Sequence, residues 1–126
     1  MVIPCYKVAA HVVELVGRIG PEVGLIVAVD DACPQGSGRL LQEQCHDPRL
    51  QVVFHEAIRG VGGAVMTGYR HAIAAGADVI VKLDGDGQMD PALLPQFIAP
   101  VLAGEADYTK GNRFYDLRYI SRMPRL

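Results

Sequence analysis

The chain has 126 residues, of which 50% are hydrophobic and 21% are charged. This is long enough for one domain with a real core, and the composition excludes a disordered or fibrous protein. The net charge of −2 gives no indication of nucleic acid as a partner. No apolar run approaches the ~20 residues of a membrane-spanning helix.

The hydrophobic pattern alternates between strands and helices. Short apolar runs bounded by turn residues indicate strands, and stripes at helical spacing between glycines and prolines indicate helices. This alternation favours an α/β fold, with a mostly parallel sheet and helices on both faces. The expected strands are 1–3, 25–29, 50–55, 79–83 and 108–111, and the expected helices are 12–19, 39–45, 60–75 and 91–102.

The cysteines and histidines show no metal-ligand pattern. Cys5, Cys33 and Cys45 are odd in number and lack ligand spacing, and the four histidines lack it too. We expect free thiols, buried or partly buried, and structural or surface histidines. Free thiols are typical of a reducing compartment, so the expected location is the cytoplasm, including the cytoplasmic face of the membrane.

The most informative stretch is the apolar run 79–83 and the acids that follow it. Asp84, Asp86 and Asp90 come after a run typical of a buried strand, which predicts a loop at its carboxyl end. Open α/β sheets bind ligands at this edge. Because only Gly85 separates them, Asp84 and Asp86 can direct two carboxylates at one point, which suits Mg²⁺ or Mn²⁺ carrying substrate phosphates. Asp90 precedes a proline and instead fits the N-cap of the next helix.

Three further loops follow predicted strands and should reach the same edge of the sheet. Asp30 and Asp31 could accept hydrogen bonds from a base or a ribose, or Asp31 could cap the loop that follows it. Gly60, Gly62 and Gly63 precede a helix whose N-terminus could attract phosphate, although small residues also serve close helix–sheet packing. The three loops are 4–7, 30–38 and 55–63.

Four motifs occur in a specific order along the chain. They are residues 2–6 (VIPCY), 27–31 (VAVDD), 83–91 (LDGDGQMDP) and 110–113 (KGNR). Together they resemble the nucleotide-sugar-binding half of a family 2 glycosyltransferase with a GT-A (Rossmann-like) fold. Within that family, the chain resembles the polyprenyl- or dolichyl-phosphate mannose synthase branch. The resemblance covers nearly the whole chain.

The resemblance implies roles for the matching positions. The residues that would line the base and ribose site are Pro4, Tyr6, Val29 and Asp31. Gly85 would pass close to the sugar nucleotide, and Lys7 departs from the asparagine that the family usually has there. The metal ligands would be Asp84, Asp86 and Gln88. Together with Asp84 and Asp86, Arg113 would form the catalytic set, in which it would contact the diphosphate or the acceptor phosphate. The alternative for Arg113 is a solvated arginine at the end of a strand.

The implied activity is transfer of a sugar from a nucleoside-diphosphate sugar (GDP- or UDP-) by metal-assisted, inverting displacement. The acceptor would be a polyprenyl phosphate or a glycan, with the full-length protein associated with the membrane. Arg118, Arg122 and Arg125 could meet such an acceptor or form a solvated face.

Residues 1–126 look incomplete at both ends, so we expect a partial nucleotide-sugar-binding domain that lacks the acceptor-binding part and has little activity alone. Two alternatives stay open from the residues themselves. One is a phospho-receiver signalling domain, which also carries acids at strand ends. The other is a nucleotide-binding fragment without catalytic activity.

Overall fold

Three parallel strands form the sheet in the computed structural model, which describes residues 1–112. They are β1 (Val2–Cys5), β2 (Ile26–Asp30) and β3 (Leu50–Phe54), in the order β1-β2-β3. β1 and β2 consist almost entirely of buried residues, as expected for strands covered on both faces. Because the strands are parallel, their carboxyl ends meet at one edge of the sheet.

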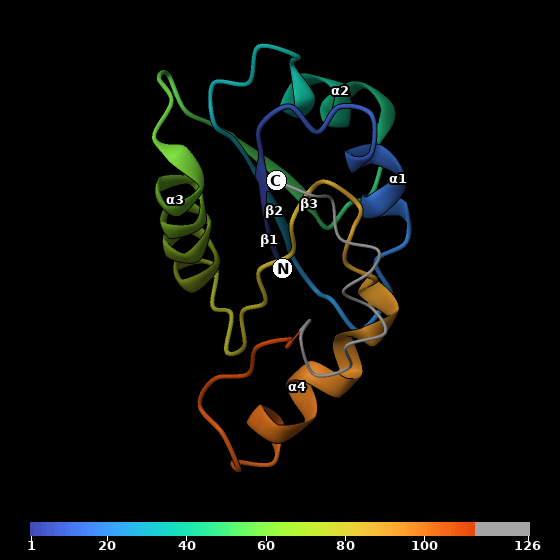
Figure 1. The fold of residues 1–126 in the computed structure, drawn as a ribbon, viewed down its shortest axis with the longest axis vertical. Coiled ribbons are helices and arrows are strands. Elements are labelled where there is room, and N and C mark those ends of the chain that lie inside the picture. Colours follow the sequence, from blue (N-terminus) through green and yellow to red (C-terminus); the bar gives the residue numbers. More distant parts are fainter. Residues whose placement is uncertain (113–126) are drawn as a thin grey trace. The chain divides into compact units, whose positions relative to one another are not determined.

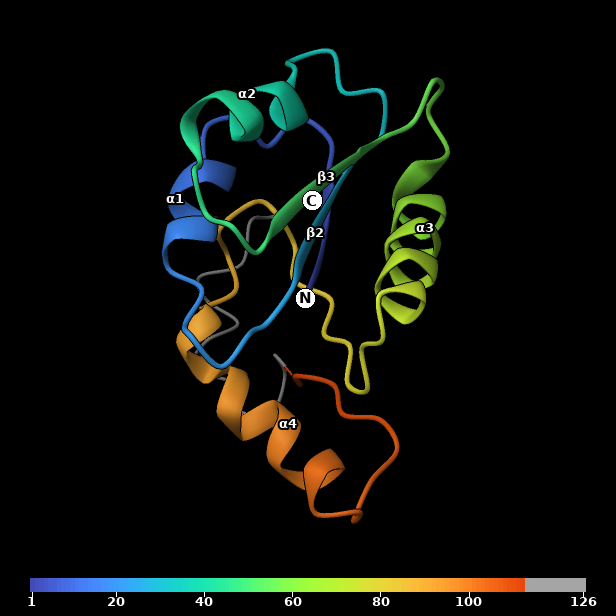
Figure 2. The ribbon, with the colours of Figure 1, turned by 180° about the vertical axis from the view of Figure 1, so that it is seen from behind.

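Helices cover both faces of this sheet, which confirms the predicted α/β architecture. α3 (Gly60–Ala74) lies on one face, and α1 (Val12–Gly17) and α2 (Ser37–Gln44) lie on the other, as Figure 1 and the reverse view in Figure 2 show. These elements begin and end within two residues of their predicted bounds. The core cluster between the sheet and α3 consists of Val2, Val27, Val29, Ala64 and Ala72.

Small residues let α3 approach the sheet closely. A Cβ atom built on Gly68 would lie 2.2 Å from Cγ1 of Val2, which is far inside van der Waals contact. Ala64 and Ala72, one helical turn to either side, are also buried. Small residues at these positions therefore allow close helix–sheet packing.

The predicted fourth strand is wrong in its extent. Segment 79–83 joins β1 only through a parallel bridge between Val2 and Lys82, made by two hydrogen bonds. The Val2 amide donates to the Val81 carbonyl at 2.8 Å, and the Leu83 amide donates to the Val2 carbonyl at 2.9 Å. The next bond of a parallel ladder would start from the amide of residue 4. That residue is Pro4, which has no N–H, so the ladder stops.

The chain divides into one unit ending at Ala92 and a second beginning at Leu93. In the first, Asp90 Oδ1 accepts the Ala92 amide at 3.0 Å, which confirms Asp90 as a cap. The predicted helix 91–102 is a 3₁₀ turn, η1 (Pro91–Leu93), followed by α4 (Leu94–Leu102).

The predicted strand 108–111 is wrong, because within residues 1–112 this segment forms no strand and instead contacts α4. The Thr109 hydroxyl donates to the Phe97 carbonyl at 2.7 Å. A Cβ atom on Gly111 would lie 3.1 Å from the Phe97 ring.

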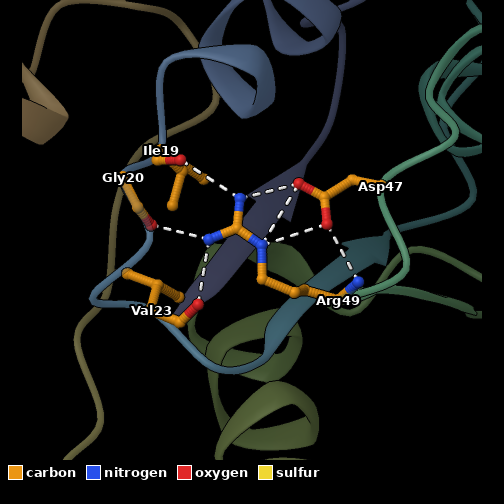
Figure 3. Close-up of polar contacts among 5 residues, drawn as sticks. All are labelled: Ile19, Gly20, Val23, Asp47 and Arg49. Atoms are coloured by element: carbon orange, nitrogen blue, oxygen red, sulfur yellow. Dashed lines mark hydrogen bonds and ion pairs between the residues drawn. The ribbon is translucent and has the colours of Figure 1, made fainter.

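At the amino ends of the strands, Arg49 joins the segment before β3 to the segment between α1 and β2 (Figure 3). Its guanidinium group forms an ion pair with Asp47 at 2.7 Å. The same group donates to the carbonyls of Gly20, Val23 and Ile19 at 2.6, 2.9 and 3.1 Å. The hydrogen bonds from Arg49 hold the pKa of the Asp47 carboxyl below its usual value. Within residues 1–112, the ion pair and the hydrogen bonds of this guanidinium are therefore all internal to the fold.

Candidate functional site

A cavity of about 510 Å³ lies at the carboxyl ends of β1 and β2, within the size range of small-molecule sites. Its walls come from the loop after β1, the residue after β2, the start of α3 and the loop 84–90, called the acidic loop below. Six residues singled out from the sequence line it together: Pro4, Tyr6, Asp31, Asp84, Gly85 and Asp86.

Two other predicted site residues, Val29 and Gln88, do not line this cavity. Val29 is fully buried in the core, on the same inward face of β2 as Val27, because side chains alternate along a strand. Its side chain therefore cannot line a base or ribose site. The Gln88 side chain is exposed and does not line the cavity, although its amide donates to Asp86 Oδ1 at 3.0 Å. Arg113 lies outside the described residues, as do Arg118, Arg122 and Arg125.

Asp31 connects β2 to the loop before α3. Its Oδ1 accepts the Arg59 amide at 2.8 Å and contacts Nδ1 of His55 at 2.7 Å. Its Oδ2 accepts the Gly60 amide at 2.8 Å, so Asp31 caps α3 from a distance in sequence. His55 also contacts Thr67 on α3 through Nε2, at 2.8 Å. Together these contacts hold the segment between β3 and α3 in place. Gly60, at the end of that segment, lines the cavity.

These contacts set the electrostatic state of the Asp31 carboxyl. Burial alone would raise its pKa, but the hydrogen bonds from His55 and from the amides of Arg59 and Gly60 outweigh burial and lower it. Asp31 therefore remains a carboxylate at neutral pH. A carboxylate offers about four lone-pair sites, so Oδ2 can still accept a bond from a ligand.

Asp30, rather than Asp31, caps the loop that directly follows β2. Its Oδ1 accepts the Cys33 amide and its Oδ2 accepts the Gly38 amide, both at 2.7 Å. It is buried and does not line the cavity. The role of capping this loop, which was expected for Asp31, thus belongs to Asp30. Asp31 instead caps the start of α3.

The acidic loop packs directly against the loop after β1. A Cβ atom on Gly85 would lie 3.1 Å from Val8 and 3.2 Å from the Pro4 carbonyl oxygen, so a glycine allows this approach. Asp84 forms an ion pair with Lys82, and each side chain is 31% exposed. No local sequence pattern indicates this pair, although the two residues are only two positions apart.

The donor set at the cavity fits a divalent cation that arrives with its ligand. Within residues 1–112, no three His, Cys, Asp or Glu side chains gather into a ready-made metal site. Asp84 and Asp86 nevertheless supply two carboxylates to one cavity. Mg²⁺ is commonly held by one or two carboxylates, with waters and substrate phosphates completing its shell.

The cavity also has apolar residues that the sequence did not single out. Ile58 and Val61 line it and are 61% and 64% exposed. Ile58 precedes α3 and Val61 lies in its first turn, and no local sequence pattern indicates that they line a cavity. The described cysteines are free, with Cys5 buried and the others partly buried, as expected.

Comparison with known proteins decides the family. The model of glycosyl transferase family 2 matches residues 1–125. The chain belongs to this family. This confirms the resemblance drawn from the four motifs and gives no support to a phospho-receiver domain.

Three of the relatives are named for transfer of mannose to a prenyl phosphate. The chain is 34% identical to the undecaprenyl-phosphate mannosyltransferase of Micrococcus luteus, over 89% of this chain and 46% of that protein. It is 34% identical to the polyprenol monophosphomannose synthase of Mycolicibacterium smegmatis, over 90% and 44% respectively. It is 30% identical to the dolichol-phosphate mannosyltransferase of Pyrococcus furiosus, over 90% and 32%. The chain thus spans about half the length, or less, of these relatives. Within residues 1–112, no helix has the length and apolarity needed to cross a membrane.

Proposed function

We propose that this chain supplies the donor-binding part of a glycosyltransferase that transfers a sugar from a nucleoside-diphosphate sugar to a polyprenyl phosphate. The observation that carries the proposal is the cavity, where Asp31, Asp84 and Asp86 converge from separate loops at the carboxyl edge of the sheet. Family membership and the names of three relatives support the same activity. Because polyprenyl phosphates are membrane lipids, the acceptor would be presented at a membrane surface.

In this proposal, the cavity residues divide the work of holding the donor. Pro4 and Tyr6 would contact the base and ribose, and Asp31 would accept a hydrogen bond through its spare lone pair. Asp86 would be the principal ligand of Mg²⁺ or Mn²⁺, because Asp84 already has Lys82 as a counterion. Gln88 and Arg113 remain predicted contacts of the metal and of the phosphates.

The proposed reaction is a displacement at the anomeric carbon of the sugar. An oxygen of the acceptor phosphate forms a bond to that carbon, while the bond to the diphosphate breaks and its electron pair leaves with the nucleoside diphosphate. A lipid phosphate is already anionic, so no general base is required. When bound, the divalent ion would offset the negative charge that develops on the leaving diphosphate. The contribution of the chain is to hold the donor in an orientation that permits attack from the opposite face, with inversion.

A thermal-shift experiment tests the donor part of this proposal. Because only Asp84 and Asp86 are proposed as carboxylate ligands, Mn²⁺ alone should shift the melting temperature little. Mn²⁺ with GDP or with UDP should raise it clearly, because a ligand that binds only the folded state stabilises it. Acetyl phosphate with Mn²⁺ should have no comparable effect. No stabilisation by either nucleotide would contradict the proposal.

Asp86→Ala sharpens this test. It should weaken Mn²⁺-dependent nucleotide binding by about 100-fold, or ~2.7 kcal/mol, with little effect on folding. Asp78→Ala is the matched control, since Asp78 is exposed and does not line the cavity. Undiminished metal-dependent binding by Asp86→Ala would refute the metal assignment. Strong binding that is the same with and without Mn²⁺ would also refute it.

A further inference from the structure

The charges that line the cavity differ in how far the fold compensates them. Asp31 is engaged by His55 and by two backbone amides, and Asp84 is paired with Lys82. Among the described residues, Asp86 accepts a hydrogen bond only from the backbone amide of Gln88. Lys7 also lines the cavity and has no carboxylate partner within residues 1–112. Two charges of opposite sign, on Asp86 and Lys7, are therefore left for a ligand.

The backbone at Lys7 has an uncommon conformation. Its φ of 55° lies in the left-handed region, which non-glycine residues rarely adopt. The turn is held by the Lys7 amide, which donates to Cys33 Sγ at 3.1 Å, and Cys33 in turn contacts Ser37 Oγ at 3.1 Å. Such conformations persist where the surroundings fix them, and they concentrate at ligand sites.

The position of the ammonium group is also constrained. Lys7 Nζ lies over the ring of Tyr6, 5.4 Å from its centroid. Tyr6 lines the same cavity, so the cation is held beside it instead of extending freely into solvent.

Two other positive features near the cavity already have an acidic partner. The amides of Arg59, the N-cap residue of α3, and of Gly60, its first residue, donate to Asp31, which offsets part of the positive end of this helix. The Lys82 ammonium group is paired with Asp84. Among the described residues at the cavity, the Lys7 side chain is thus the cation with no anion beside it.

We propose that Lys7 binds a phosphate oxygen of the ligand while Asp86 binds the accompanying divalent cation. This rests on the proposed function and adds a residue to its site. A lysine ammonium group suits the role because it is a compact charge with three donors. The phosphate is that of the donor diphosphate or that of the lipid acceptor, since both present anionic oxygens.

Calorimetric titration in the presence of Mn²⁺ tests the donor source. GDP is compared with guanosine, and UDP with uridine, on wild type, Lys7→Gln and Lys7→Arg. Lys7→Gln should weaken diphosphate binding about tenfold and leave nucleoside binding unchanged, and Lys7→Arg should retain most of the affinity. Arg70→Gln, which removes an exposed charge on α3, is the control and should change neither affinity.

Co-sedimentation with phosphatidylcholine vesicles, with and without polyprenyl phosphate, tests the acceptor source on the same variants. A loss of affinity in Lys7→Gln that is confined to diphosphates supports the proposal and identifies the donor as the source of the phosphate. A loss confined to vesicles that contain the lipid phosphate supports it and identifies the acceptor. Equal affinities for wild type and Lys7→Gln in both assays would overturn it. An equal loss for nucleosides and diphosphates would also overturn it, because Lys7 would then act only through Tyr6. A wild-type chain that binds none of these ligands would instead contradict the proposed function itself.

Discussion

The two edges of the sheet use charged residues in opposite ways. At the amino edge, Arg49 donates to Asp47 and to three backbone carbonyls, so its charge and its donors are used within the fold. At the carboxyl edge, Asp86 and Lys7 face a cavity without charged partners in the described part of the chain. Both edges are polar, and the cavity described above lies at the second.

The difference shows that charge alone does not identify a site. Asp31 makes this clear, because it lines the cavity and yet resembles Arg49 in its many internal bonds. We therefore expect substitutions of compensated charges to change stability first. Substitutions of uncompensated charges should change ligand binding first.

The largest effect on stability is expected for Asp31→Asn. The substitution removes a buried charge that accepts from His55, Arg59 and Gly60, and it should lower the free energy of unfolding by about 3 kcal/mol at neutral pH. Chemical denaturation of both proteins measures this difference.

The same comparison has a defined pH dependence. The pKa of Asp31 is lower in the folded protein than its ordinary value of 3.8. Its stabilisation is therefore fully present above that value and is lost as the pH falls through the lower, folded pKa. The stability difference between wild type and Asp31→Asn should shrink between about pH 5 and about pH 2. A difference that grows on acidification would contradict the assignment.

The amino edge should respond to Arg49→Ala with a loss of stability of about 2 kcal/mol, because three carbonyls and Asp47 lose their donor. Arg49→Lys should recover only part of this, since an ammonium group cannot reproduce the planar fork. Affinity for Mn²⁺ and nucleotide should stay unchanged in both, measured under conditions where each variant is folded. A selective loss of nucleotide affinity would show that the amino edge also contributes to ligand binding, which contradicts the division of roles between the two edges.

The smallest effects concern α3, which provides one wall of the cavity. Gly68→Ala should destabilise by about 1–2 kcal/mol, because its Cβ would meet Val2. Gly62→Ala, in the same helix, meets nothing within 4 Å and should stabilise by about 0.5 kcal/mol through helix propensity. Thermal unfolding of the pair measures both. Equal changes would show that close packing at Gly68 is not the reason for its glycine.

Local sequence patterns predicted the parts of this site that local chemistry determines. An apolar run followed by Asp84-Gly85-Asp86 was enough to predict carboxylates at the edge of a parallel sheet, and both now line one cavity. Asp90 as a cap followed in the same way from the proline after it. The family followed from the order of four motifs.

The features that the sequence did not predict depend on long-range partners. Asp31 contacts His55, Arg59 and Gly60, which lie 24 to 29 residues away, so no local pattern indicates that it caps α3. Val29 faces the core because of the register of β2, which its apolar type alone does not reveal. Segment 108–111 was expected to be a strand, but it contacts the helix α4 instead, through Thr109 and Phe97.

The central claim is that the acidic loop holds a divalent ion against a nucleotide diphosphate. A crystal structure with Mn²⁺ and GDP or UDP, phased to show the anomalous signal of manganese, tests it most directly. The account predicts a manganese peak within coordination distance of the Asp86 carboxylate, with the diphosphate oxygens completing its shell. A nucleotide bound in the cavity with manganese remote from both Asp84 and Asp86 would contradict it.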